Sequence, residues 1–192
     1  MRIEFLLEES SMKVFLESFL PRVLPSNFIL NENYFLRSHS GKSDLQKSIP
    51  LKIKAFNNYH EPVIIIILHD QDSNDCQILK NELLSLCSNS SPNISVLVRI
   101  VCRELESWYL GDMASIQQAY PNFASQKFEK KAKFRNPDLT NASYELKRIL
   151  PEFQKVEGAR RISPYMNISD NKSNSFHQFA SGLEKIINSK IG

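Results

Sequence analysis

Glycine is scarce in this chain of 192 residues. There are only five glycines, and none belongs to a Gly-X-X-X-X-Gly-Lys loop, which argues against a P-loop type of nucleotide-binding module. The three cysteines, Cys76, Cys87 and Cys102, form no closely spaced pair, which argues against a disulfide framework and against a zinc knuckle. A reducing compartment is the simplest interpretation, and we expect a cytoplasmic protein.

Long apolar runs and a strong net charge are also missing. The most apolar stretch, residues 63–68, is far too short to span a bilayer, and charge breaks the N-terminal run, so we expect neither a membrane segment nor a signal peptide. The net charge of +3 neither requires nor excludes nucleic acid as a partner. A hydrophobic content of 42% is ordinary for a globular protein with a core.

Four short apolar runs predict β-strands, at residues 3–7, 28–36, 63–68 and 94–101. Apolar residues at helical spacing follow each of the first three runs. The third run is continuously apolar and mostly β-branched, which is typical of a strand covered on both faces. The strand–helix alternation predicts an α/β fold: a mostly parallel four-stranded sheet flanked by helices, with Rossmann-like layering.

The second half of the chain reads differently. After Trp108 the pattern becomes helical and more polar, with short helices and loops expected over 112–150 and a final amphipathic helix around Phe176 and Ile187. Residues 88–93, rich in Asn, Ser and Pro, predict a loop. We therefore expect an α/β core at 1–111 and a helical extension at 112–192 that packs on it as a single globular unit.

Acidic residues follow three of the predicted strands. They are Glu8 and Glu9 after the first strand, Asp70 and Asp72 after the third, and Glu104 and Glu106 near the end of the fourth. The carboxyl ends of parallel strands meet at one edge of a sheet, where ligands commonly bind. Carboxylates gathered there repel one another, and the usual relief is a hard cation or protonation of one member.

Magnesium is the expected cation, with manganese as a substitute, because no His/Cys set with transition-metal spacing competes. Asp70 and Asp72 are the strongest candidates, since residues two apart face the same way on extended backbone. Glu8 is the candidate third ligand or general base. The alternative is that the acids cap the following helices. Glu104 and Glu106 could instead pair with nearby arginines, Arg99 and Arg103.

Two groups of basic residues are candidates for phosphate contact. Lys42 after Gly41, together with Lys155, Arg160 and Arg161, could hold phosphate, and the last three could instead neutralise the acids. The second group could track a nucleic-acid backbone, although a solvated helix face explains it at least as well. It comprises Lys127, Lys130, Lys131, Lys133 and Arg135, interleaved with Phe128 and Phe134.

Six segments stand out together: Glu8-Glu9, Gly41-Lys42-Ser43-Asp44-Leu45, His69-Asp70-Gln71-Asp72-Ser73-Asn74-Asp75-Cys76, the stretch from Arg99 through Glu104-Leu105-Glu106-Ser107-Trp108-Tyr109-Leu110-Gly111-Asp112, Lys155-Val156-Glu157-Gly158-Ala159-Arg160, and Ser173-Asn174-Ser175-Phe176. In this order, and over nearly the whole chain, they resemble the bacterial domain-of-unknown-function family 4276.

That family is similar to the Toprim fold of topoisomerases, primases and overcoming-lysogenization-defect nucleases. The Toprim pattern has a Glu after the first strand and Asp-X-Asp after a later one, places that Glu8, Asp70 and Asp72 would fill. The resemblance implies magnesium-dependent phosphodiester chemistry and a link to ATPase partners in defence against phage or mobile elements. Toprim proteins usually have Gly after the first Glu, so either Glu8 or Glu9 is the functional acid here.

The main hypothesis is therefore a magnesium-dependent, Toprim-like nuclease that cuts DNA or RNA, with an ATPase partner and no membrane association; the oligomeric state is left open. The expected catalytic residues are Glu8, Asp70, Asp72 and Glu106, and the expected metal ligands are Glu8, Glu9, Asp70, Asp72 and Glu104. Lys42, Lys155, Arg160 and Arg161 are the expected phosphate contacts. The alternatives are a non-catalytic interaction or sensor subunit and a metal–nucleotide binding module.

Overall fold

The computed structural model describes residues 1–88 and 93–191. At its centre lies a four-stranded, entirely parallel sheet with the order β2-β1-β3-β4. The strands are β1 (Arg2–Leu7), β2 (Tyr34–Ser38), β3 (Val63–Asp70) and β4 (Ile94–Val101). The predicted parallel α/β fold is confirmed. The loop predicted at 88–93 falls largely on residues 89–92, which lie outside the described residues.

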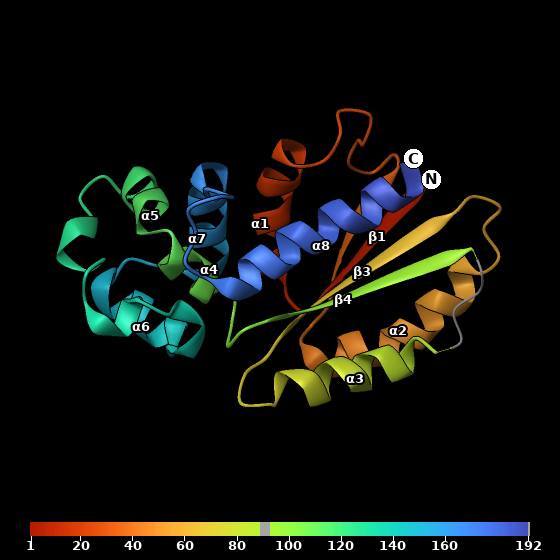
Figure 1. Ribbon diagram of the computed structural model, residues 1–192, viewed down its shortest axis with the longest axis horizontal. Helices are drawn as coiled ribbons and strands as arrows, with labels where there is room; N and C mark the ends of the chain where they lie inside the picture. Colours follow the sequence, from red (N-terminus) through yellow and green to blue (C-terminus); the bar gives the residue numbers. More distant parts are fainter. Residues whose placement is uncertain (89–92, 192) are drawn as a thin grey trace.

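Helices cover both faces of the sheet. The helices that follow the first three strands are α1 (Ser10–Phe19), α2 (Lys42–Phe56) and α3 (Cys76–Leu86). In Figure 1, α2 and α3 lie on one face, whereas α1 and the C-terminal helix α8 (Asn174–Ile191) lie on the other. Every residue of β3 is buried. The central strand is therefore covered on both sides, and its alternate side chains enter two separate apolar clusters.

The rest of the chain forms a largely helical part at one end of the sheet (Figure 1). Its helices are α4 (Glu106–Gly111), α5 (Met113–Ala119), α6 (Ala142–Ile149) and α7 (Lys155–Ile162). The 3-10 turns of this part are η2 (Ser125–Lys127), η3 (Ala132–Phe134), η4 (Pro137–Leu139) and η5 (Ser163–Tyr165), and a further one, η1 (Leu20–Arg22), follows α1. The short helices predicted over 112–150 and the final helix are confirmed. None of the helices in the described part has the length and apolar character needed to cross a membrane.

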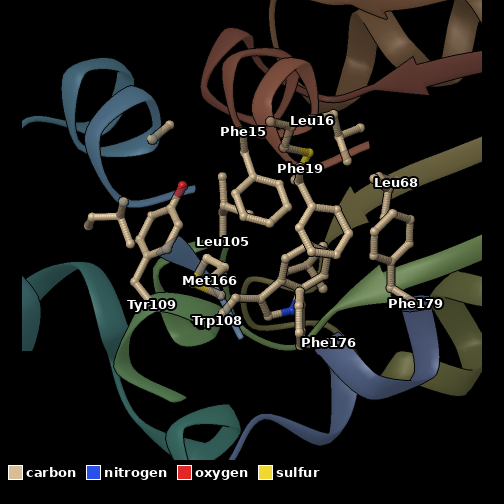
Figure 2. Close-up of a cluster of buried hydrophobic side chains, with 14 of the residues drawn as sticks. Phe15, Leu16, Phe19, Leu68, Leu105, Trp108, Tyr109, Met166, Phe176 and Phe179 are labelled. Atoms are coloured by element: carbon tan, nitrogen blue, oxygen red, sulfur yellow. The ribbon is translucent and has the colours of Figure 1, made fainter. Parts of the chain in front are cut away.

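An aromatic cluster joins the helical part to the sheet (Figure 2). The Trp108 ring stacks on Phe179 of α8, with centroids 5.2 Å apart, and meets the edge of Phe15 of α1 at 5.4 Å. The Trp108 Nε1–H donates to Ser175 Oγ at 2.9 Å. Aromatic pairs of this kind add to the free energy gained by burial. The cluster therefore fixes α4, which begins at Glu106, against both α1 and α8.

The second strand lies later in the chain than predicted. The expected strand covered residues 28–36, but β2 is Tyr34–Ser38, and before it Leu30 makes only an isolated bridge. Asn31 has a φ of 65°, in the left-handed region that asparagine tolerates better than most residues. The Asn33 side chain closes the turn by accepting from the Ile29 N–H and donating to the backbone of an earlier residue. Local hydrogen bonds of asparagine therefore override the strand propensity of this segment.

Candidate metal centre

Two acids from neighbouring strands meet at the carboxyl edge of the sheet. Glu8 directly follows β1, and Asp70 is the last residue of β3; the two strands pair with Leu7 opposite Leu68. The Asp70 backbone N–H donates to Glu8 Oε2 at 2.9 Å. Only 9% of Glu8 and 5% of Asp70 is exposed. Parallel pairing thus places two buried carboxyl groups side by side, as the sequence predicted for these two residues.

Glu8 is held in its ionised form by His69. The His69 Nδ1 lies 2.9 Å from Glu8 Oε2 and 2.6 Å from the Asp70 carbonyl oxygen. Since both neighbours are acceptors, Nδ1 carries a proton. Burial works against the ionised carboxyl, but the hydrogen bond and charge of His69 outweigh it and lower the pKa of Glu8. Burial also opposes a charged imidazole, yet Glu8 raises the pKa of His69.

Asp70 is in the opposite situation. Burial raises its pKa well above the usual range, and the charges of Glu8, Glu9 and Glu106 raise it further, whereas Lys155 works in the other direction. Within the described part of the chain, the buried Asp70 Oδ1 has no hydrogen-bond partner. A buried carboxylate oxygen without a donor is costly unless it is protonated or meets a cation.

Glu106 is the second acid of this kind. It begins α4, is 1% exposed, and has a pKa that burial raises to about 7, with Glu104 and Glu9 adding to the rise against the opposing charge of Lys155. Its Oε2 is buried and, among the described residues, has no hydrogen-bond partner. Two unpartnered carboxyl oxygens, from Asp70 and Glu106, therefore belong to one electrostatically coupled group.

Lys155, the first residue of α7, is the cation of this group. Its Nζ lies 3.6 Å from Glu9 Oε2 and 4.0 Å from Glu106 Oε1. Burial disfavours the charged amine, but Glu106, Glu9 and Asp70 outweigh this effect and raise the pKa of Lys155. Lys155 therefore stays charged and partly neutralises the acids, as one of the two interpretations of its segment predicted.

Asp72 does not join Asp70. Its φ of 52° takes the backbone out of the extended conformation, so the expectation that both aspartates face the same way is wrong. Its half-exposed carboxylate lies 3.5 Å from Lys42 Nζ. The Asp72 N–H donates to the Arg103 carbonyl at 2.9 Å. Asp72 and Lys42 thus form a pair on the rim rather than within the buried acids.

The helix-capping alternative fails for the buried acids. Asp75, not Asp72, caps α3, by accepting from two backbone N–H groups of the first turn. Glu9 occupies the N-cap position of α1 without a capping bond, and its carboxylate accepts from Ser11 Oγ. Glu104 does hold a helix end, since its Oε1 accepts from the Ser143 N–H at the start of α6 at 2.6 Å.

The arginines near these acids have other partners. Arg99 Nε donates to the Gln178 carbonyl oxygen, and Arg103 Nη1 lies 3.5 Å from the Asp72 carbonyl oxygen. Arg160 pairs with Glu157 on the surface at 2.7 Å. Arg161 donates to a backbone carbonyl at 2.7 Å and lies over the ring of Tyr120. Of the three predicted phosphate contacts on α7, the structure brings Lys155 to the acids.

The second basic group does not form a helix face. Lys127, Lys130, Lys131, Lys133 and Arg135 are exposed on the 3-10 turns η2 and η3 and the loops around them. Lys133 Nζ contacts Glu145 of α6 at 2.6 Å. The group is therefore a solvated basic surface on the helical part, and its contact with nucleic acid stays a prediction.

Tyr109 is a further buried polar group near the acids. Its hydroxyl is buried and has no hydrogen-bond partner in the described residues, and burial raises its pKa well above 10, helped by the charge of Glu106. Residues three apart on a helix share a face, so its position three residues after Glu106 was the available signal. Tyr109 is thus a neutral donor near the acids.

The side chains alone do not enclose an ion. Across residues 1–88 and 93–191, no three or more His, Cys, Asp or Glu side chains are arranged to hold a metal ion by themselves. Magnesium commonly keeps several waters and uses one or two carboxylates together with substrate phosphate. The unpartnered oxygens of Asp70 and Glu106 could supply the one or two carboxylate ligands of such a site, with waters and substrate phosphate completing the coordination.

A family model described as "Domain of unknown function (DUF4276)" matches residues 7–184, which include all the acids above. Neither a curated protein nor a solved structure matches the chain. The relation to Toprim proteins stays a prediction. The chain belongs to the DUF4276 family.

Proposed function

We propose that this protein is a magnesium-dependent, Toprim-like nuclease that acts on nucleic-acid phosphodiesters. The observation that supports it best is the pair of buried, unpartnered carboxyl oxygens, Asp70 Oδ1 and Glu106 Oε2, at the carboxyl edge of a parallel sheet. Perturbed carboxyl groups at such an edge are more common in functional sites than elsewhere. Buried carboxyl groups without hydrogen-bond partners lower the stability of the fold, so stability does not explain their presence at this edge.

A divalent cation fits these residues. Asp70 and Glu106 would hold it through the oxygens that lack a donor, with Glu9 beside them on the rim; Glu8 Oε2 is already engaged by His69 and the Asp70 N–H. When bound, the ion would supply positive charge for the phosphoryl oxygens and a more acidic water. Mn²⁺ would be able to substitute for Mg²⁺ at this site, since it accepts the same oxygen ligands.

The chain's own residues would bind and orient the substrate. Lys155 Nζ, which lies 3.6 Å from Glu9 and 4.0 Å from the buried Glu106, would contact the scissile phosphate. Lys42 on the rim would contact a neighbouring phosphate. Without a metal the pKa of Glu106 is about 7, so near neutral pH this carboxyl would readily give up its proton and bind the ion through Oε2.

Nucleic acid is the proposed substrate because basic side chains lie exposed on the helical part, from Lys127 to Arg135. Their charges could follow a phosphate backbone without reading its sequence. An ATPase partner, a role in defence against phage or mobile elements, and a cytoplasmic location are parts of the same proposal, and they rest on the resemblance described above.

The test is cleavage by the purified full chain. Single-stranded and duplex DNA and RNA are incubated with Mg²⁺, with Mn²⁺ or with EDTA. We expect metal-dependent cleavage that falls by about 100-fold or more in Asp70→Asn, as expected when a group that holds charge at the reaction centre is lost. Glu82→Gln, a change at an exposed acid of α3, is the matched control.

Equal cleavage by the wild type and Asp70→Asn would refute the assignment of the site. An absence of cleavage on every substrate, with metal and with the ATPase partner present, would favour the alternative of a non-catalytic subunit. Saturable nucleotide binding without turnover would favour the metal–nucleotide module.

A further inference from the structure

Two of the three cysteines meet at the carboxyl edge of the sheet, next to the loops that follow β3 and β4. Cys76 is the first residue of α3, and Cys102 directly follows β4. Their Sγ atoms lie 3.9 Å apart, and both side chains are partly exposed. Twenty-five residues separate them in sequence, so sequence spacing gave no sign of the contact. The remaining cysteine, Cys87, is buried and donates to the Leu83 carbonyl within its own helix.

We propose that Cys76 and Cys102 form a reversible, oxidisable dithiol that closes to an intramolecular disulfide when the protein meets a peroxide. The sulfurs need to approach from 3.9 Å to about 2 Å, which side-chain rotation can supply over so short a gap. A reducing compartment keeps such a pair as thiols, and disulfides that form there are usually transient or redox-sensing. This proposal does not depend on nuclease activity.

The chemistry balances with one peroxide molecule. The partly exposed Cys76 sulfur attacks a peroxide oxygen; the O–O bond breaks, and one water leaves. The resulting sulfenic acid is then attacked by the Cys102 sulfur, which forms the S–S bond and releases a second water. The two thiols lose one hydrogen each and are oxidised by two electrons, while the peroxide is reduced to two waters.

The cross-link would act on loops that carry the acids. The Gln71 N–H donates to the Val101 carbonyl at 2.8 Å, and the Arg103 N–H donates to Gln71 Oε1 at 3.0 Å. The Asp72 N–H donates to the Arg103 carbonyl at 2.9 Å. The loop after β3 and the loop after β4 are therefore already joined on both sides of Cys102. A disulfide between them would restrict the segment that runs from Asp70 to Cys76.

The experiment uses the full chain, reduced and then treated with hydrogen peroxide. Intact mass and peptide mapping under non-reducing conditions should show the loss of two hydrogen atoms and a Cys76–Cys102 cross-linked peptide. Alkylation in denaturant, which exposes the buried Cys87, should then label one cysteine instead of three, and dithiothreitol should restore all three. Amide exchange at Asp72 should slow by about tenfold or more in the oxidised form.

Cys76→Ser and Cys102→Ser should each abolish the cross-link. Cys87→Ser should retain it, because Cys87 takes no part in the disulfide. This variant should also stay folded, since a serine hydroxyl can keep the hydrogen bond to the Leu83 carbonyl. Far-UV circular dichroism checks that each variant is folded. Full labelling of all three cysteines after peroxide would overturn the proposal. So would a cross-link through Cys87, a disulfide between two chains, or oxidation of Cys76 to the sulfonic acid without a cross-link.

Discussion

Replacing Glu106 by glutamine should stabilise the metal-free protein at pH 8 while weakening its response to magnesium. In the folded chain the Glu106 carboxyl is 1% exposed and its pKa is about 7, against 4.5 for an unperturbed glutamate. Between these values the folded protein holds a proton that the unfolded chain releases. The stability present below pH 4.5 is therefore lost as the pH rises toward 7.

The size of this loss follows from the two pKa values. The interval from 4.5 to about 7 corresponds to about 3 kcal/mol, at about 1.4 kcal/mol per pH unit. Glutamine has nearly the same shape and no charge, so Glu106→Gln removes the cost of burying an ion. At pH 8 the variant should gain about 3 kcal/mol over the wild type, and at pH 5 less than about 1 kcal/mol.

The assay is urea unfolding of both proteins at pH 5 and pH 8, first in EDTA and then with excess Mg²⁺. Magnesium should stabilise the wild type at pH 8, by about 2 to 3 kcal/mol at a concentration 100 times its dissociation constant, and should stabilise the variant clearly less. Glu82→Gln, at an exposed acid, should leave both the pH profile and the magnesium effect unchanged.

A Glu106→Gln variant that is no more stable than the wild type at pH 8 in EDTA would contradict a raised pKa at Glu106. So would a variant that gains as much stability at pH 5 as at pH 8. An equal magnesium effect on both proteins would leave the electrostatic account in place but remove Glu106 from the metal centre.

Two further predictions concern the scaffold. Glu4 is fully buried and pairs with Arg37 Nε at 2.6 Å and with Arg2 Nε at 2.7 Å, so Glu4→Ala should cost about 2 kcal/mol in chemical unfolding, because both partly exposed arginines lose a charge-assisted hydrogen bond. A Cβ on Gly158 would lie 2.1 Å from the Phe153 ring, so Gly158→Ala should cost about 2 kcal/mol. Gly182→Ala, where a Cβ meets only the end of a flexible arginine, should stay within about 1 kcal/mol of the wild type by the same measurement; equal losses at both glycines would contradict this steric argument.

Much of the fold could be predicted because its signals are local. The continuous apolar run from Val63 to Leu68 indicates a strand buried on both faces, and in the structure every residue of β3 is buried. Strand–helix alternation then predicts parallel pairing, and parallel pairing brings Glu8 and Asp70 to one edge. The first two members of the site thus follow from pattern and topology.

The remaining members depend on features that sequence patterns do not carry. The sequence around Asp72 does not predict the left-handed backbone conformation of this residue. In the structure, the Asp72 carboxylate lies next to Lys42. Lys155 reaches Glu9 only because α7 packs against α1, and chain order does not specify how the helical part docks. The same docking buries Tyr109 near the acids.

The most direct test of the carboxylate site is a crystal structure of the full chain soaked in Mn²⁺, recorded at a wavelength where manganese scatters anomalously. We expect an anomalous peak within coordination distance of Asp70 Oδ1 and Glu106 Oε2, and we expect this peak to be lost in Asp70→Asn crystals grown in the same way. Manganese bound elsewhere with none at these two oxygens, or an unchanged peak in Asp70→Asn, would contradict the account.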